Sequence, residues 1–257
     1  MVYDVTDVLR VESDGPVRIV TLNRPEQLNA FDDELHQQFG RLWMYVEADL
    51  DARVVVLTGA GRAFCAGGSI DDFDRFREDF AARRRSMRNA RRIVDELLNV
   101  HVPVVAAVNG PAVGLGSTLS SLCDAVFIAD DTYLADPHVA VALVAGDGAA
   151  VTWPAHTGLL RAKRYLLTGD RIPAADAVAM GLATEAVPRD QVLAESLAFA
   201  HRLAELPPQA VQETKAVLNQ TLRRNAVGAL GYGLAAESQS HDTTEYAAVP
   251  ARFRDRK

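Results

Sequence analysis

Two buried strands, each followed by a glycine-rich loop, constrain the fold of this chain more than any other feature. RVVVLTG (residues 53–59) and VPVVAAVNG (residues 102–110) are nearly continuous runs of apolar residues. Such runs are typical of parallel strands that are covered on both faces. The loops GAGRAFCAGGSI (59–70) and GPAVGLG (110–116) follow them. Because ligands bind outside the carboxyl ends of strands in open α/β sheets, we expect a binding site where these loops meet.

The pattern around these strands predicts the other elements. VLRVE and VRIVTL, separated by the turn signal SDGP, predict a hairpin. Asp32 is placed to cap a helix over residues 33–50, and a long helix is expected over residues 72–99. AVFIAD and TYLAD predict two further strands.

After Ala149 the sequence has helical patterns and almost no strand signal. We therefore predict an α/β protein with a core over residues 1–190 and a helical C-terminal region over residues 191–257.

Charge and composition exclude several classes of protein. The net charge of −7 disfavours nucleic acid or an anionic membrane as a partner. No apolar run is long enough to cross a bilayer, and MVYDVTDVLR lacks the pattern of a secretory signal. Cys65 and Cys123 are the only cysteines and have no disulfide or zinc spacing. We expect a cytoplasmic protein with no metal site.

The glycine-rich loops allow two interpretations. Backbone N–H groups from both loops could converge on one oxygen atom and stabilise a negative charge there. Alternatively, both loops are simply tight turns. Other motifs fit less well: VVVLTGAGRAF lacks the third glycine of a dinucleotide fingerprint, no phosphate-binding P-loop occurs, and Gly67–Asp71 lacks the closing glycine of a nucleophile elbow.

Three segments together carry a family resemblance. LNRPEQLNAF, GAGRAFCAGGSI and PVVAAVNGPAVGLGSTLSSLCD, in this order and spacing, resemble the enoyl-CoA hydratase/isomerase (crotonase) superfamily over about residues 10–190. The resemblance implies a crotonase-like spiral of ββα units and a helical C-terminal trimerisation region. It also implies a homotrimer or a dimer of trimers. The implied substrate is an acyl-CoA thioester, with no cofactor beyond the coenzyme A of that substrate.

The resemblance also implies which residues bind substrate. The N–H groups of Gly68 and Leu115 would hold the thioester oxygen in an oxyanion hole. The remaining implied substrate-binding residues are Arg24, Leu28, Ala30, Ala66, Gly67, Ser69, Ile70 and Gly114.

The sequence departs from the family where its hydratases carry two catalytic glutamates. Thr118 and His138 occupy these positions. A threonine hydroxyl cannot act as an effective general base, so the two-glutamate hydration mechanism does not transfer. Thr118 could instead hold a water molecule by a hydrogen bond.

His138 and Asp147 offer a different acid–base pair. Histidine is a natural general base near neutral pH when an aspartate orients its second ring nitrogen. We favour a catalytic role for His138 with Asp147 as the orienting residue. The alternative is that His138 caps a loop and that Asp147 caps the helix beginning near Ala149.

This pair also resembles the 6-oxocamphor hydrolase branch of the superfamily, which cleaves β-diketones without coenzyme A. Glu237 stands where that branch has a further acidic residue, although it could equally be a solvated carboxylate. Leu115 disagrees with that branch, which has a histidine near this position. Three hypotheses remain open: an acyl-CoA enzyme, a hydrolase of a small ketone (or of the thioester), and a non-catalytic family member.

The remaining polar residues indicate no further site. RRRSMRNARR (residues 83–92) could attract the coenzyme A phosphates, but we favour a solvated face or a subunit contact. The other histidines have no metal-ligand spacing: His36, His101, His156, His201 and His241.

Overall fold

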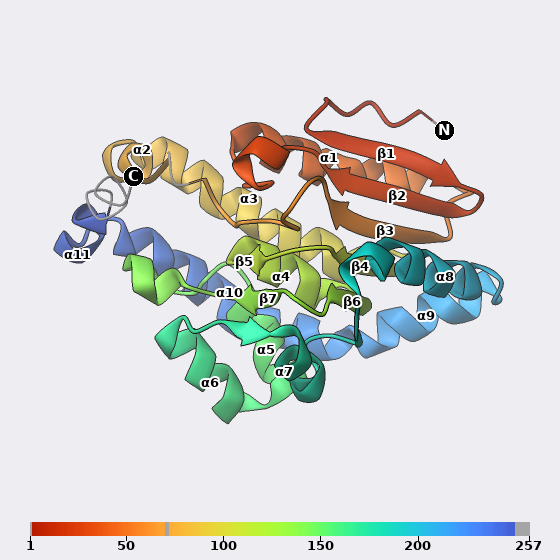
Figure 1. Ribbon diagram of the computed structural model, residues 1–257. Helices are drawn as coiled ribbons and strands as arrows, with labels where there is room; N and C mark the ends of the chain where they lie inside the picture. Colours follow the sequence, from red (N-terminus) through yellow and green to blue (C-terminus); the bar gives the residue numbers. More distant parts are fainter. Residues whose placement is uncertain (1, 70–71, 250–257) are drawn as a thin grey trace.

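The computed structural model describes residues 2–69 and 72–249 and is built on two sheets (Figure 1). The larger sheet has the strand order β1-β2-β3-β4-β6-β9, in which only the β1–β2 pair is antiparallel. Its strands are β1 (Leu9–Asp14), β2 (Val17–Leu22), β3 (Val54–Gly59), β4 (Val104–Val108), β6 (Ala125–Ala129) and β9 (Glu185–Val187). The smaller sheet contains β5 (Ala112–Val113), β7 (Tyr133–Ala135) and β8 (Ile172–Pro173).

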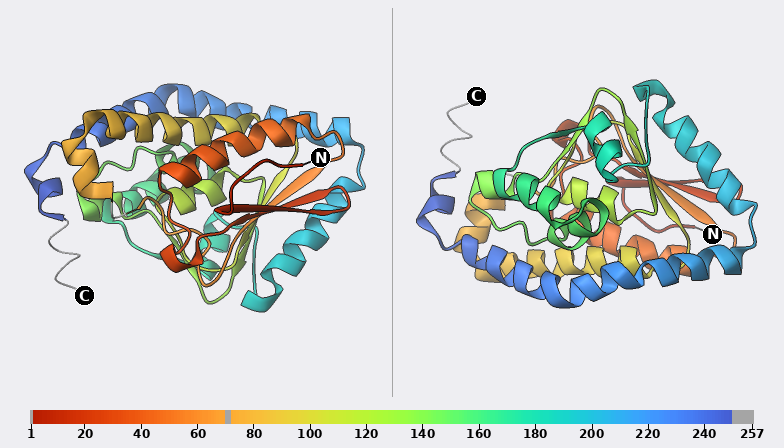
Figure 2. Two further views of the ribbon diagram at one scale, coloured as in Figure 1. Left: turned by 90° about the horizontal axis from the view of Figure 1, so that it is seen from above. Right: turned by 90° about the horizontal axis from the view of Figure 1, so that it is seen from below.

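Helices surround both sheets (Figure 2). The helices before residue 145 are η1 (Pro25–Gln27), α1 (Asp33–Ala48), α2 (Phe73–Glu78), α3 (Phe80–Asn99), α4 (Leu115–Leu122) and η3 (His138–Val141). Those after it are α5 (Ala149–Thr157), α6 (Leu159–Thr168), α7 (Ala174–Met180), η4 (Arg189–Gln191), α8 (Val192–Ala204), α9 (Pro208–Leu218), α10 (Gln220–Ser240) and α11 (Thr244–Ala247).

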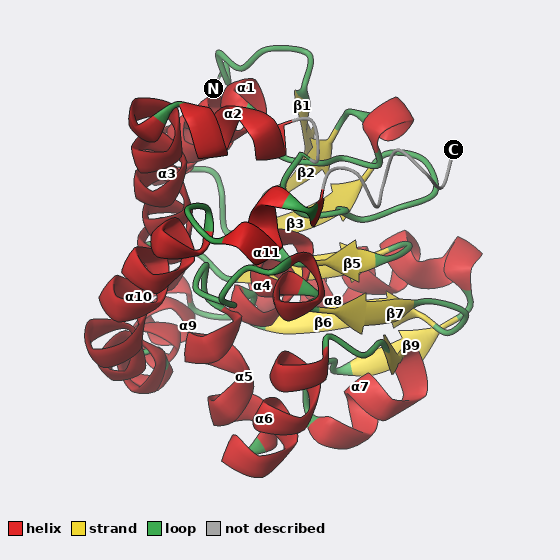
Figure 3. Ribbon diagram, turned by 90° about the vertical axis from the view of Figure 1, so that its left-hand side faces the viewer, coloured by secondary structure: helices red, strands yellow, loops and turns green. Residues whose placement is uncertain are grey.

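Alternation along β3 explains how both faces of the larger sheet are covered. Val55 and Leu57 belong to the core formed with α1 and α3, whereas Val54 and Val56 pack with α8. Successive side chains of a strand point to opposite faces, so an uninterrupted apolar run requires helices on both sides. On one edge of this arrangement α4 packs against β5 (Figure 3). This contact places the start of α4 beside the two glycine-rich loops.

The hairpin and the strands predicted from apolar runs are confirmed as β1, β2, β3, β4, β6 and β7. The single long helix predicted over residues 72–99 is wrong, because the chain becomes extended at Asp79. The Asp79 side chain accepts hydrogen bonds from the N–H groups of Ala81 and Ala82 and starts a new helix there. The break separates α2 from α3 and turns α2 over the candidate site.

The C-terminal half contains two strands that its sequence pattern does not predict. β8 has two residues and β9 has three, so neither offers an alternating or β-branched run. β9 nevertheless pairs in parallel with β6 and extends the larger sheet. The predicted division at residue 190 falls within η4, just before α8, and stays a prediction. No helix among the described residues is long and apolar enough to cross a membrane.

Candidate active site

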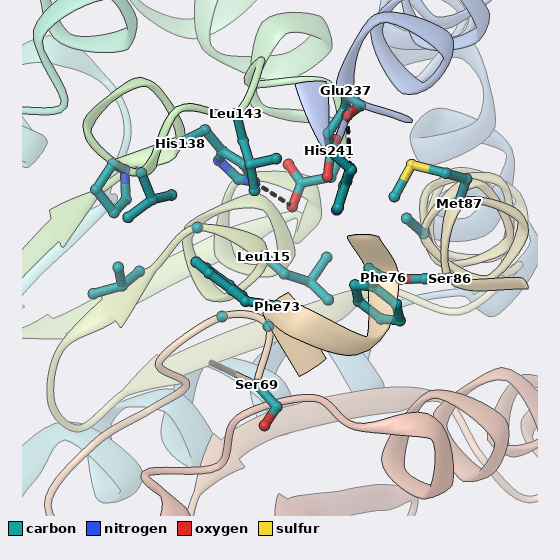
Figure 4. A pocket seen from close by; sticks show the side chains of 18 of the residues that line it. Ser69, Phe73, Phe76, Ser86, Met87, Leu115, His138, Leu143, Glu237 and His241 are labelled. Atoms are coloured by element: carbon teal, nitrogen blue, oxygen red, sulfur yellow. Dashed lines mark hydrogen bonds and ion pairs between the residues drawn. The ribbon is translucent and has the colours of Figure 1, made fainter. Parts of the chain in front are cut away.

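A cavity of about 300 Å³ lies where the glycine-rich loops approach η3, α2, α3 and the C-terminal helices (Figure 4). It contains most of the residues that the sequence singles out. Those that line it are Ala66, Gly67, Gly68, Ser69, Gly114, Leu115, His138, Asp147 and Glu237. The two predicted loops therefore meet at one cavity, and the binding of a ligand there stays a prediction.

The first loop is held so that one N–H group is left over. Phe31 donates its N–H to the Gly67 oxygen at 2.8 Å and accepts from the Ser69 N–H at 3.1 Å. Because N–H groups alternate in direction along an extended chain, the Gly68 N–H faces away from Phe31. Within the described residues no hydrogen bond uses this N–H group, and Gly68 lines the cavity.

The second loop ends in the N-terminus of α4. Leu115 is the first residue of that helix, and the first N–H groups of a helix have no partner within it. The Gly114 oxygen accepts from the N–H groups of Ser117 and Thr118, and the described part of the chain provides no acceptor for the Leu115 N–H. This N–H is available to a ligand in the cavity that Leu115 lines.

Gly67 brings the two loops into contact. Its φ is +92°, and a Cβ atom there would lie 2.8 Å from the Val113 oxygen and 3.6 Å from the Leu115 nitrogen. A side chain at this position would therefore be strained and would also push the loops apart. The glycine lets the Gly68 segment lie directly beside the start of α4.

His138 lies between two carboxylates. It begins η3, and its Nδ1 is hydrogen-bonded to Oδ1 of Asp136, which is completely buried. Its Nε2 lies 3.6 Å from Oδ2 of Asp147. The sequence prediction paired His138 with Asp147 alone; the structure adds Asp136 on the opposite side of the ring. Asp136 therefore takes the orienting position at the second ring nitrogen.

Asp147 belongs to this cluster and does not cap α5. Gly148 occupies the cap position, and no side chain caps that helix. The Asp147 carboxylate instead accepts a hydrogen bond from the Thr118 hydroxyl at 3.2 Å. Thr118 is completely buried, so its hydroxyl holds Asp147 and not the water molecule that we expected.

Glu237 comes from α10 and completes the cluster. It is buried and lines the cavity, so its interpretation as a solvated carboxylate is wrong. Two glycines let α10 approach: a Cβ on Gly146 would lie 2.3 Å from the Gly233 oxygen and 2.9 Å from Oε2 of Glu237. This contact places Glu237 beside the loop that carries Asp147.

Burial and mutual charge shift the pKa values of His138, Asp147 and Glu237. Burial lowers the pKa of the His138 imidazole, but Asp136 and Asp147 outweigh burial and raise that pKa well above its usual range. Burial raises the pKa of the Asp147 carboxyl, although the adjacent imidazole opposes this. Burial, reinforced by Asp147, also raises the pKa of Glu237 to about 8 despite the nearby imidazole. At neutral pH the imidazole is therefore charged and Glu237 carries a proton.

Comparison with known proteins identifies the family. The sequence model of enoyl-CoA hydratase/isomerase matches residues 12–249. The chain belongs to the enoyl-CoA hydratase/isomerase family. A solved enoyl-CoA hydratase/isomerase from Mycobacterium paratuberculosis is 48% identical, with a TM-score of 0.93, over 97% of this chain and 100% of that one. The predicted crotonase-like fold is confirmed by this similarity.

Two enoyl-CoA-type hydratases are similar to this chain at lower identity. (E)-Benzylidenesuccinyl-CoA hydratase from Thauera aromatica is 33% identical over 206 residues, which cover 80% of this chain and 79% of the relative. Mitochondrial enoyl-CoA hydratase from Pongo abelii is 29% identical over 210 residues, covering 80% and 71%. This member of the enoyl-CoA hydratase/isomerase family is thus similar to hydratases over most of its length.

Three of the predicted substrate-binding residues of this family member lie outside the lining of the cavity. Arg24 forms an ion pair with Asp32 and a hydrogen bond with Gln27. Leu28 accepts a hydrogen bond from the Ala66 N–H, so it supports the first loop through its backbone. Ala30 is partly buried nearby. Ile70 lies outside the described residues.

Several residues of the site give no signal in the sequence. Asn29 is buried and donates from its amide to the oxygens of Ala60 and Ala63, which fixes the LNAF segment against the first loop. His36 and His241 line the cavity although they lie far from His138 in the sequence. Burial lowers the pKa of His36 to about 4, so that imidazole is neutral. Only tertiary packing brings these residues together.

The basic segment 83–92 is divided between two environments. Arg83 is buried and pairs with Asp242 at 2.7 Å, which joins α3 to the end of α10. Arg84, Arg85 and Arg88 are exposed on α3. The exposed arginines are compatible with either a solvated face or a subunit contact, whereas Arg83 contacts the C-terminal region.

The sequence predicts no metal site, but one cluster of side chains in the structure has the residue types that bind metal ions. Asp136, His138 and Asp147 offer ligand atoms within 4.8 Å of one another. The two carboxylates lie at opposite nitrogens of one ring, so the imidazole stands between them. A metal ion shared by the three residues would need one oxygen of each carboxylate and one ring nitrogen to point toward the same position, because all ligands of an ion face it. The arrangement suits proton transfer.

Proposed function

We propose that this enzyme binds an acyl-CoA thioester and moves a proton at the carbon next to the thioester carbonyl. One observation carries the proposal: a single cavity is lined by two unused backbone N–H groups and by the His138 cluster. Loss of that proton places negative charge on the thioester oxygen. The residues that hold this oxygen and those that exchange the proton must therefore face the same space.

The N–H groups of Gly68 and Leu115 hold the thioester oxygen in this proposal. Their positions are fixed by the Phe31 bridge and by the start of α4, so little reorganisation is needed when charge develops. Such preorganised donors contribute about 10²–10³-fold to the rate of related reactions. They require no particular side chain, because both donors belong to the backbone.

Asp147 is the proton acceptor in this mechanism. With its Nδ1 held by Asp136, the charged imidazole of His138 presents Nε2–H to Asp147. The Thr118 hydroxyl holds the other carboxylate oxygen. The sequence prediction assigned the base to His138, but an imidazole that is already protonated cannot accept a proton. We therefore exchange the two roles.

Glu237 supplies the second acid of the reaction. It is protonated at neutral pH and can deliver a proton to a different carbon of the substrate. Asp147 removes a proton from one carbon of the substrate, and Glu237 delivers a proton to another carbon, so the double bond moves between them. Transfer of a proton from Asp147 to Glu237 within the cluster then restores both groups. This chemistry uses only the chain's own groups and no cofactor beyond the coenzyme A of the substrate.

Deuterium exchange tests this function. The enzyme is incubated in D₂O with a panel of acyl-, enoyl- and β-ketoacyl-CoA thioesters, and the products are identified by mass spectrometry. Deuterium at the carbon next to the carbonyl is expected. Asp147→Asn and His138→Ala should each slow exchange by about 10²–10⁴-fold while coenzyme A affinity stays nearly unchanged. The exposed His201→Gln serves as the control. Release of coenzyme A without deuterium exchange would show thioester hydrolysis instead.

A second candidate, hydrolysis of a carbon–carbon bond in a small β-diketone, is favoured by the burial of Glu237 beside Asp147. In this case no coenzyme A is involved. Calorimetry with coenzyme A and acetyl-CoA at millimolar concentration separates the two candidates, since only the thioester enzyme should bind. Wide separation and solvent exposure of His138 and Asp147 would favour the non-catalytic hypothesis. These residues lie 3.6 Å apart and are mostly buried, which supports a catalytic role instead.

A further inference from the structure

The wall of the cavity formed by α2, α10 and α11 is aromatic. Phe73 and Tyr246 are stacked with ring centroids 5.4 Å apart, and Tyr246 also contacts the His241 ring at 4.6 Å. Phe76 packs edge-on against His241 at 5.9 Å. All four side chains line the same cavity as His138. The cluster is therefore a continuous wall and not a set of separate contacts.

The α2 part of this wall faces the proton-transfer groups, whereas His241 lies beside Glu237 and donates from Nδ1 to its backbone oxygen at 2.9 Å. Figure 4 shows His138 and Glu237 on one side of the cavity, with Phe73 and Phe76 on the other and Leu115 between them. A thioester whose oxygen is held at Leu115 must send its acyl group along this wall. Tyr246 donates its hydroxyl to the Phe73 oxygen at 3.2 Å, which ties α11 to α2 and fixes the rings in place.

The cavity also disfavours negative charge. Asp136, Asp147 and Glu237 surround one imidazole. No arginine or lysine occurs among the described residues of the lining. The charged His138 imidazole is already flanked by Asp136 and Asp147. A second carboxylate on the acyl group would therefore be buried near these acids without a free cationic partner, which is costly.

Building on the proposed acyl-CoA function, we infer that the enzyme selects an uncharged acyl group that carries a flat ring. Aromatic rings prefer offset stacked or edge-on contacts, and the Phe73, Phe76, His241 and Tyr246 wall offers both. A flexible linear chain gains only burial from the same surface. The cavity of about 300 Å³ is at the small end of ligand sites, which suits a compact ring.

Three thioesters of equal acyl carbon number test this inference by calorimetry. Phenylacetyl-CoA carries a ring, octanoyl-CoA a linear chain, and the monothioester of octanedioic acid a chain ending in a carboxylate. Octanoyl-CoA has the larger apolar chain, so burial alone would favour it. We expect phenylacetyl-CoA to bind about threefold to tenfold more tightly than octanoyl-CoA. The octanedioic thioester should bind most weakly.

A matched pair of variants assigns the preference to the wall. Phe76→Leu should reduce the ratio of phenylacetyl-CoA affinity to octanoyl-CoA affinity toward one, because it removes an aromatic ring but keeps an apolar side chain. Phe80→Leu, at an exposed position on α3 outside the cavity, should keep the preference. If Phe76→Leu does not fold, the relative affinities of the three thioesters for the wild-type protein still test the inference. Equal or tighter binding of either chain would overturn the inference and leave the acyl-CoA function intact. Failure of all three to bind would overturn the proposed function, and this inference with it.

Discussion

At the scale of single residues, the site depends on an imidazole held between two carboxylates. Asp136 does not line the cavity, so it acts through His138 as a positioning residue. Its Oδ2 has no hydrogen-bond partner among the described residues, although the side chain is completely buried. A carboxylate kept in this environment stabilises the charged form of the imidazole.

Asp136→Asn should lower the pKa of His138, because one of the two flanking negative charges is removed. The alkaline limb of the pH–rate profile should then move to lower pH, and turnover at pH 7 should fall by about 10²-fold. The measurement is kcat/KM against pH, with the exposed Asp131→Asn as control. A uniform loss of activity with an unchanged profile would indicate a merely structural role.

Glu237 makes stability depend on pH. Its pKa is raised from 4.5 to about 8, so the folded chain retains a proton that the unfolded chain has lost between these values. The free energy of unfolding should therefore decrease as pH rises from about 4.5 to about 8. Glu237→Gln removes this dependence.

The Gln variant should be about 1–3 kcal/mol more stable than the wild type at pH 9, where the wild type buries a charge. This corresponds to a higher Tm by roughly 2–4 °C per kcal/mol. At pH 5 the two proteins should unfold at nearly the same temperature, as measured by circular dichroism. The same difference at both pH values would contradict the assigned titration.

At the scale of elements, function depends on how closely the first loop approaches α4. Gly67→Ala should displace the Gly68 N–H and reduce kcat by about 10²–10³-fold. Gly158→Ala is the matched control, because Gly158 also has a positive φ but no atom lies within 4 Å of its added Cβ. Both variants should lose about 1–2 kcal/mol of stability from backbone strain, but only Gly67→Ala should lose activity. Thermal unfolding and deuterium exchange measure the two effects.

The elements also show what the sequence can and cannot predict. Apolar runs identify β3 and β4 because strands buried on both faces must be apolar throughout. Asp79 is a recognisable helix cap, yet the apolar periodicity around it continues and conceals the break. His138 is predictable from its position in a family motif. His36 and His241 are not, because they reach the cavity only through packing between elements distant in sequence. Asp136 is only two residues from His138, but the contact depends on the turn at Pro137, which the sequence pattern does not specify.

At the scale of the whole molecule, we predict self-association into a trimer or a dimer of trimers. Large apolar side chains are exposed on α6, α9 and α10, among them Leu160 at 84%, Leu218 at 69% and Val227 at 89%. Such surfaces are typical of subunit contacts. Light scattering should give three or six times the chain mass of 27.8 kDa. A monomer would contradict the prediction.

The close contact between Gly146 and Gly233 makes completion of the site depend on the docking of α10. During synthesis on the ribosome, the loops, the imidazole and its two aspartates emerge well before α10. Until α10 has been synthesised and has docked through Gly233, Glu237 is absent from the cluster. The proton acceptor Asp147 is then present without the proton donor. A chain that lacks α10 therefore also lacks the proton donor Glu237, and we expect activity only after α10 has docked.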